Sequence, residues 1–171
     1  IDAFELLHQS FGGSGYDIAC AQNNTPITYS IVNGIPKVEQ LTFEPEFAKN
    51  IYFVYLNEKR NSKSAIAEYH SNKTSQLSNY INTIDTLTQD IIAAKDLESF
   101  SQLLQQHERV LSEILSTKTI KDSLFPDFDG AIKSLGAWGG DFVLVVSKEN
   151  PSSYFIDKGY ETVIPYGDMI L

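Results

Sequence analysis

The chain has 171 residues, of which 13 are basic and 22 are acidic, so its formal net charge is −9. This balance argues against nucleic acid or an anionic membrane as the main partner, because both attract clustered positive charge. A hydrophobic content of 42% is typical of a packed globular protein. The one cysteine, Cys20, cannot form an internal disulfide, and no apolar run approaches the roughly 20 residues of a membrane-spanning helix.

The chain opens inside a predicted element. Apolar side chains between residues 3 and 7 are typical of the last turns of a helix, and Gly12-Gly13 follow as its stop. The first residue is Ile1, and the one methionine is Met169. We therefore expect this sequence to be the C-terminal part of a longer protein.

A short helix and three strands are predicted next. Ser14 is expected to cap a helix that continues to about residue 22. Strands follow at 27–32 and 37–43, and Asn33-Gly34 between them favours a tight hairpin turn. The apolar run at 51–56 predicts a third, buried strand.

The pattern then changes to two long amphipathic helices. Apolar residues recur at steps of three and four from 66 to 91, and Asp96 begins a second helix that runs to 115. The remaining elements are predicted as a turn at 129–130, strands at 131–135 and 142–146, a helix at 151–158 ended by Gly159, and a strand at 162–166. This order predicts an α+β fold, a mostly antiparallel sheet with the long helices packed on one face.

Two glycine-rich segments are candidates for chemistry. In the first, residues 12–17, glycines before a helix let the backbone approach a ligand, and the helix N-terminus offers N–H groups to an anion. The macrodipole is expected to lower the pKa of Asp17, whose carboxylate can then orient a hydroxyl, accept its proton or hold a cation. By residue type alone, the favoured interpretation of Asp17 is an ordinary helix-start residue. The second segment, 136–141, has three glycines in five positions, and is either a ligand-binding loop or a connection with Trp138 folded onto the core.

A third candidate is the polar segment 57–64, which follows the strand at 51–56. Lys59, Arg60 and Lys63 suit a phosphate or carboxylate in an otherwise acidic chain. The alternative is a solvated turn in which Ser62 or Ser64 caps the next helix. His8, His70 and His107 lack metal-ligand spacing, and Cys20 is expected on the inner face of its helix as a small hydrophobe.

Together the two glycine-rich segments, GSGYDIACA and KSLGAWGGDF, resemble the second half of a GHMP-superfamily small-molecule kinase, of the mevalonate and phosphomevalonate kinase type. The resemblance implies that residues 1–24 end the nucleotide half and that 25–171 form the C-terminal domain. It places Asp17 at the acceptor hydroxyl as base or orienting carboxylate. The positions that match the family's two motifs are Gln9, Gly13, Ser14, Gly15 and Asp17, then Gly136, Ala137, Gly139, Gly140 and Asp141.

Two departures from the family pattern are visible. Trp138 stands where these kinases have a central glycine, and their nucleotide-binding loop does not occur in these residues. The resemblance further implies that the segment containing Lys59 and Ser62 faces the active site.

As a function, the resemblance implies ATP-dependent phosphoryl transfer to mevalonate or phosphomevalonate in the cytoplasm, with ATP and Mg²⁺ as cofactors. Mg²⁺ would be held by ATP and by residues outside this chain, so no metal ligand is expected here. The expected partners are ATP and a small acidic substrate, and a homodimer is the expected oligomer. The alternatives are a diphosphomevalonate decarboxylase-like lyase and a non-catalytic binding or dimerisation module.

Overall fold

The computed structural model describes residues 3–4, 7, 14–58, 77–136 and 141–170. Internal contacts divide the chain into two units, one up to residue 44 and one from 45 to 170. The predicted domain boundary at residue 24 stays a prediction. In the part of the chain that is described, no helix is long and apolar enough to cross a membrane.

The first unit contains helix α2 (Tyr16–Ala21) and a hairpin of strands β1 (Ile27–Val32) and β2 (Ile35–Gln40). Asn33 and Gly34 form its turn with φ values of 54° and 79°. Two consecutive positive φ angles are the signature of the tight hairpin turn that this dipeptide predicts.

The second strand of this hairpin begins earlier than predicted. A two-residue turn pairs Val32 directly with Ile35, so β2 starts at Ile35 rather than at residue 37 and ends at Gln40. The hairpin tip leaves apolar side chains exposed, including Ile35 with 69% of its surface accessible.

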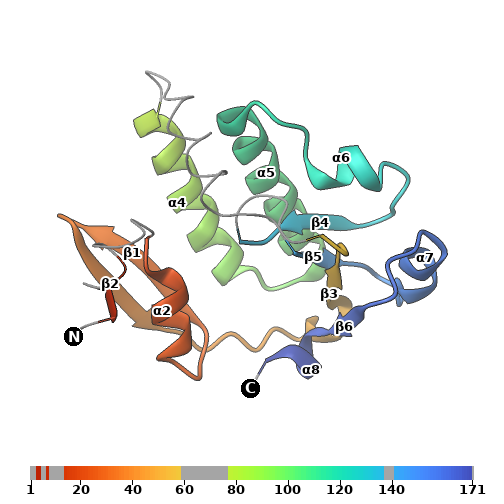
Figure 1. Cartoon of the computed structure of the whole chain (residues 1–171), viewed down its shortest axis with the longest axis horizontal. Helices are drawn as coiled ribbons and strands as arrows, with labels where there is room; N and C mark the ends of the chain where they lie inside the picture. Colours follow the sequence, from red (N-terminus) through yellow and green to blue (C-terminus); the bar gives the residue numbers. More distant parts are fainter. Residues whose placement is uncertain (1–2, 5–6, 8–13, 59–76, 137–140, 171) are drawn as a thin grey trace. The chain divides into compact units, whose positions relative to one another are not determined.

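The second unit is a four-stranded antiparallel sheet with helices around it, in the order β4-β5-β3-β6 (Figure 1). This arrangement confirms the predicted α+β fold class. Its elements in chain order are η1 (Ala48–Asn50), β3 (Ile51–Tyr55), α4 (Leu77–Ala93), α5 (Leu97–Leu115), α6 (Ile120–Leu124), β4 (Ala131–Ser134), β5 (Phe142–Val146), α7 (Ser152–Asp157), β6 (Val163–Pro165) and α8 (Tyr166–Met169).

Local sequence signals explain most of these elements. The side chain of Asp96 accepts a hydrogen bond from the Ser99 N–H at 2.8 Å and so caps α5 where predicted.

Three short helices, η1, α6 and α8, were not predicted. The last strand is shorter than expected because Pro165, which has no N–H to donate, ends it and α8 begins at once. The first part of the helix predicted from residue 66 lies outside the described residues.

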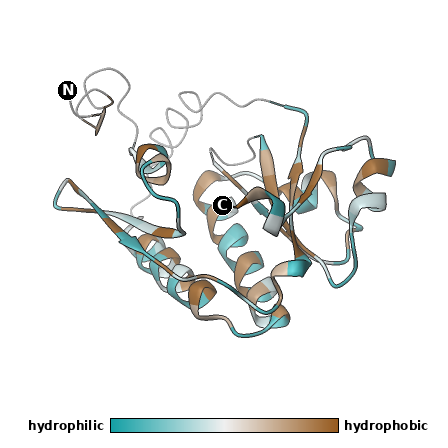
Figure 2. Cartoon of the chain, turned by 90° about the horizontal axis from the view of Figure 1, so that it is seen from below, coloured by the Kyte–Doolittle hydropathy of each residue, from teal (hydrophilic) through white to brown (hydrophobic). Residues whose placement is uncertain are grey.

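One hydrophobic cluster of this unit lies against one face of the sheet, and Ile51, Ala131 and Val146 are buried on the other face. Phe125 and Phe155 are fully buried in this cluster, with ring centroids 5.0 Å apart in a T-shaped arrangement. The sheet residues of this cluster are Tyr52, Val54, Ile132, Val143 and Val145. Helix α5 packs against β4, and α4 packs against α5. Figure 2 shows apolar and polar residues alternating around the long helices, as the predicted amphipathic pattern requires.

Candidate functional site

Asp17 lies in the first turn of α2, and its side chain is exposed. The predicted capping of this helix by Ser14 is wrong: Gly15 occupies the N-cap position, and no side chain caps the helix. The backbone explains the difference. Gly15 has a left-handed φ of 84°, and the carbonyl of Ser14 accepts a hydrogen bond from the Tyr29 hydroxyl, which fixes Ser14 outside the helix.

Packing accounts for the glycine at position 15. Gly15 is buried, and a Cβ added there would lie 2.7 Å from two ring carbons of Phe4. Only a residue without a side chain combines this contact with a positive φ. The glycine therefore has a structural reason that is independent of any ligand.

The charge of Asp17 acts on two neighbouring phenols. Burial, and then the negative charge of Asp17, raise the pKa of both Tyr16 and Tyr29. The carboxylate thus lies close to both phenols while remaining accessible.

The prediction that Cys20 faces inward is wrong, since its side chain is exposed and Ala19 is the buried residue of α2.

In the second unit, antiparallel pairing gathers three strand ends at one end of the sheet. β3 and β4 both end where β5 begins. The Leu135 N–H donates to the Phe142 carbonyl at 3.3 Å, and the Leu56 N–H donates to the Asp141 carbonyl at 2.8 Å. The start of the segment predicted at 57–64 therefore lies beside the end of the segment predicted at 136–141, and β5 separates it from the end of β4, where the second segment starts.

Both segments begin with a left-handed residue. Gly136 has a φ of 62° and is exposed, and Asn57 has a φ of 59°. The Asn57 side-chain amide donates to the Gly159 carbonyl at 2.9 Å, which ties the end of β3 to the turn after α7. Asp141 is partly buried at the start of β5. The other predicted site residues lie outside the described residues: Gln9, Gly13, Lys59, Ser62, Ala137, Trp138, Gly139 and Gly140.

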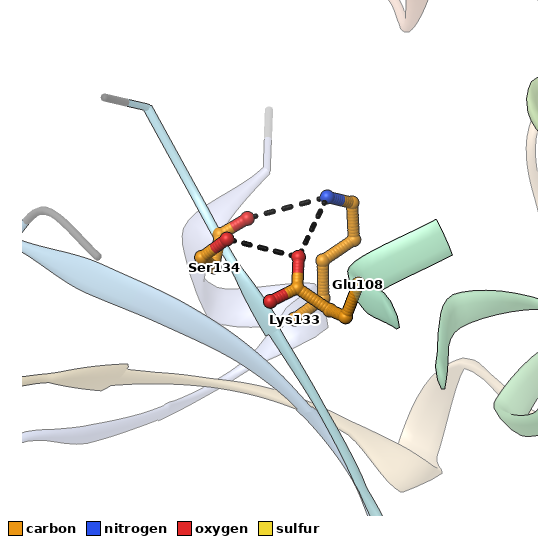
Figure 3. A network of polar contacts seen from close by, with 3 residues as sticks. All are labelled: Glu108, Lys133 and Ser134. Atoms are coloured by element: carbon orange, nitrogen blue, oxygen red, sulfur yellow. Dashed lines mark hydrogen bonds and ion pairs between the residues drawn. The ribbon is translucent and has the colours of Figure 1, made fainter. Parts of the chain in front are cut away.

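A buried polar network beside this end of the sheet was missed from the sequence. Glu108 of α5 is only 5% exposed, and its Oε1 accepts from the Lys133 Nζ at 3.3 Å and from the Ser134 Oγ at 2.9 Å (Figure 3). Burial lowers the pKa of Lys133, and the charge of Glu108 partly offsets this effect. The available signal was the position of Glu108 four residues after buried Leu104, within the apolar stripe of α5.

Comparison with known proteins finds similarity in structure but no match in sequence. The sequence matches no protein-family model and no curated protein. Among solved structures, Streptococcus pneumoniae phosphomevalonate kinase in complex with phosphomevalonate and AMPPNP is similar over 92% of this chain and 57% of its own, with 15% identity and a TM-score of 0.70. L. major mevalonate kinase in complex with R-mevalonate is similar over 89% of this chain and 50% of its own, with 15% identity and a TM-score of 0.66.

A further mevalonate kinase structure is 21% identical over 74% of this chain and 42% of its own, with a TM-score of 0.54. The chain thus spans about half the length of these kinases. At such identities the comparison establishes a shared fold: nearly all of this chain has the architecture of a part of mevalonate and phosphomevalonate kinases.

Proposed function

We propose that the protein containing this chain transfers the γ-phosphoryl group of ATP to a small hydroxy acid or its phosphate, with mevalonate and phosphomevalonate as the first candidates. The observation that carries the proposal is the fold shared over 92% of the chain with a kinase crystallised with phosphomevalonate and AMPPNP. The two glycine-rich segments and their order along the chain support the same function. We propose the cytoplasm as its location.

Asp17 is the proposed acceptor-side group. Its side chain is exposed in the first turn of α2, so a substrate hydroxyl can reach it. Asp17 then orients that hydroxyl or accepts its proton during in-line transfer. Reactions of this type depend mainly on positioning and on stabilisation of charge, which one well-placed carboxylate supports.

The segment 136–140 is proposed to border the phosphates, and Lys59 and Ser62 to meet the acidic end of the substrate. In support, both segments lie at the same end of the sheet, and the hydrogen bond from the Leu56 N–H to the Asp141 carbonyl joins the start of one to the end of the other. Gly136 is exposed and has no Cβ, so a phosphate oxygen can approach its backbone closely.

Among the described residues, no group of three or more His, Cys, Asp or Glu side chains is placed to hold a metal ion. ATP would supply the transferred phosphoryl group, and we assign no Mg²⁺ ligand to this part of the chain.

The test is Asp17→Asn in the intact protein, assayed for ADP release and for phosphorylation of mevalonate or phosphomevalonate. We expect turnover to fall by more than about tenfold, equivalent to about 1.4 kcal/mol of activation free energy. Asp168→Asn is the matched control, because Asp168 is also exposed in the first turn of a short helix. A smaller loss in Asp17→Asn, or one equal to the control, would remove Asp17 from the mechanism. Release of phosphate and CO₂ with ADP would identify a lyase instead.

A further inference from the structure

Glu108 is a charged residue in a position that usually holds an apolar one. It lies in the middle of α5, and its side chain is almost completely buried. Burial of a carboxylate is unfavourable unless charged and hydrogen-bonding partners compensate for the lost water. Here Lys133 and Ser134 provide the compensation, and they are the last two residues of β4.

The geometry of this network is unusual for a strand. Successive side chains of a strand point to opposite faces of the sheet. The side chains of Lys133 and Ser134 nevertheless reach the same oxygen of Glu108 (Figure 3). The carboxylate therefore lies beside the edge of β4 rather than over one face, and Lys133 also donates back to the Ser134 carbonyl at 3.3 Å.

Because β4 is at the edge of the sheet, its contact with Glu108 helps to hold its end in place. Among the described strands, β4 is at the edge of its sheet, with β5 as its neighbour on one side. Directly after its end, the Leu135 N–H donates to the Phe142 carbonyl of β5 at 3.3 Å, a long hydrogen bond. Glu108 holds the same end from the opposite side. Two residues after Ser134, Gly136 takes its left-handed conformation and the glycine-rich segment starts.

We propose that Glu108 is a positioning residue. Its carboxylate fixes the end of β4, and with it the place and direction in which the glycine-rich segment leaves the sheet. The effect on catalysis rests on the proposed function, in which this segment borders the phosphates. Glu108 itself touches no substrate and acts through Lys133 and Ser134.

The decisive experiment separates positioning from stability. Glu108→Leu alone leaves Lys133 buried without its partner and is expected to destabilise the fold. The double variant Glu108→Leu/Lys133→Met replaces the buried pair by apolar side chains, an exchange that often restores stability. We expect its urea midpoint to return to near the wild-type value, whereas kcat stays about 10- to 100-fold reduced and KM changes less.

A second readout does not need activity. Trp138, the one tryptophan of the chain, belongs to the glycine-rich segment. Its fluorescence, identified by subtracting the spectrum of Trp138→Phe, reports on the surroundings of that segment. We expect a shifted emission maximum or altered acrylamide quenching in the double variant. Ser134→Ala, which keeps the ion pair, is expected to fold and to shift Trp138 in the same direction by less.

Lys158→Met is the matched control, because it removes the 3.2 Å ion pair with Asp127 in the same unit, and this pair shares no residue with the Glu108 network. It should change neither kcat nor the Trp138 signal. The positioning role is overturned if the double variant regains kcat together with stability, or if Trp138 is unaffected in both the double variant and Ser134→Ala. If the wild-type protein transfers no phosphoryl group, the proposed function is wrong. The fluorescence of Trp138 still tests whether Glu108 fixes the glycine-rich segment.

Discussion

His107 is expected to make the stability of the second unit depend on pH in mildly acidic solution. The residue lies in α5, half-buried, and its Nδ1 is a buried atom without a hydrogen-bond partner among the described residues. Burial, and then the positive charge of Lys133, lower the pKa of His107 from 6.5 to about 4. The folded state therefore favours the neutral form of the His107 ring.

The sign and size of the effect follow from this shift. Because the pKa is lower in the folded than in the unfolded state, the unfolded chain binds more protons below pH 6.5, and stability is lost as the pH falls toward about 4. Between pH 7 and pH 5 the full shift corresponds to about 2 kcal/mol. Since the ring is only half-buried, solvent screening reduces this value, and we expect about 1 kcal/mol.

The assay is urea unfolding followed by far-UV circular dichroism, which is dominated by the long helices α4 and α5. The free energy of unfolding at pH 7 and at pH 5 is compared between the wild type and His107→Gln, which cannot titrate. Other groups contribute equally to both proteins, so the difference between the two pH dependences isolates His107. Equal pH dependence in both proteins would refute the reasoning.

Three further substitutions test the packing of the fold. Gly15→Ala should unfold the region of α2 locally, because φ is 84° and the new Cβ would lie 2.7 Å from Phe4; hydrogen exchange of α2 measures the loss of protection. Gly130→Ala places a Cβ 2.4 Å from the Val146 carbonyl oxygen and should cost about 1–3 kcal/mol in urea unfolding, whereas Gly167→Ala, with open space around it, should cost much less. Phe155→Ala, in the fully buried aromatic cluster, should cost about 3–5 kcal/mol by the same measurement.

Most of the fold could be predicted because its signals are local. The continuous apolar runs of β3 and β5, the Asn33-Gly34 turn and the Asp96 cap each depend on residues within a few positions of one another. The errors have local causes too. Ser14 is a favourable capping residue by type, but the left-handed Gly15 takes the cap position, and Phe4 from the preceding segment packs against that glycine.

The candidate site could be predicted less completely, because it depends on which strands pair. The sequence indicates the strands at 51–56 and 142–146 but does not indicate that they are neighbours. Their antiparallel pairing places Leu56 against Asp141, and so brings two polar segments to one end of the sheet. Composition made each segment a candidate by itself, and the resemblance to kinases assigned both to one active site, whereas the spacing of residues alone gave no reason to connect them.

The Glu108 network shows the same limitation for side chains. A carboxylate within the apolar stripe of a helix can indicate a functional group, a buried ion pair or an edge of the stripe that reaches solvent. Which applies depends on the strand that the helix packs against, and here that strand ends in Lys133 and Ser134. Because the partners come from the residues that lead directly into the glycine-rich segment, a contact that stabilises the fold also determines where that segment starts.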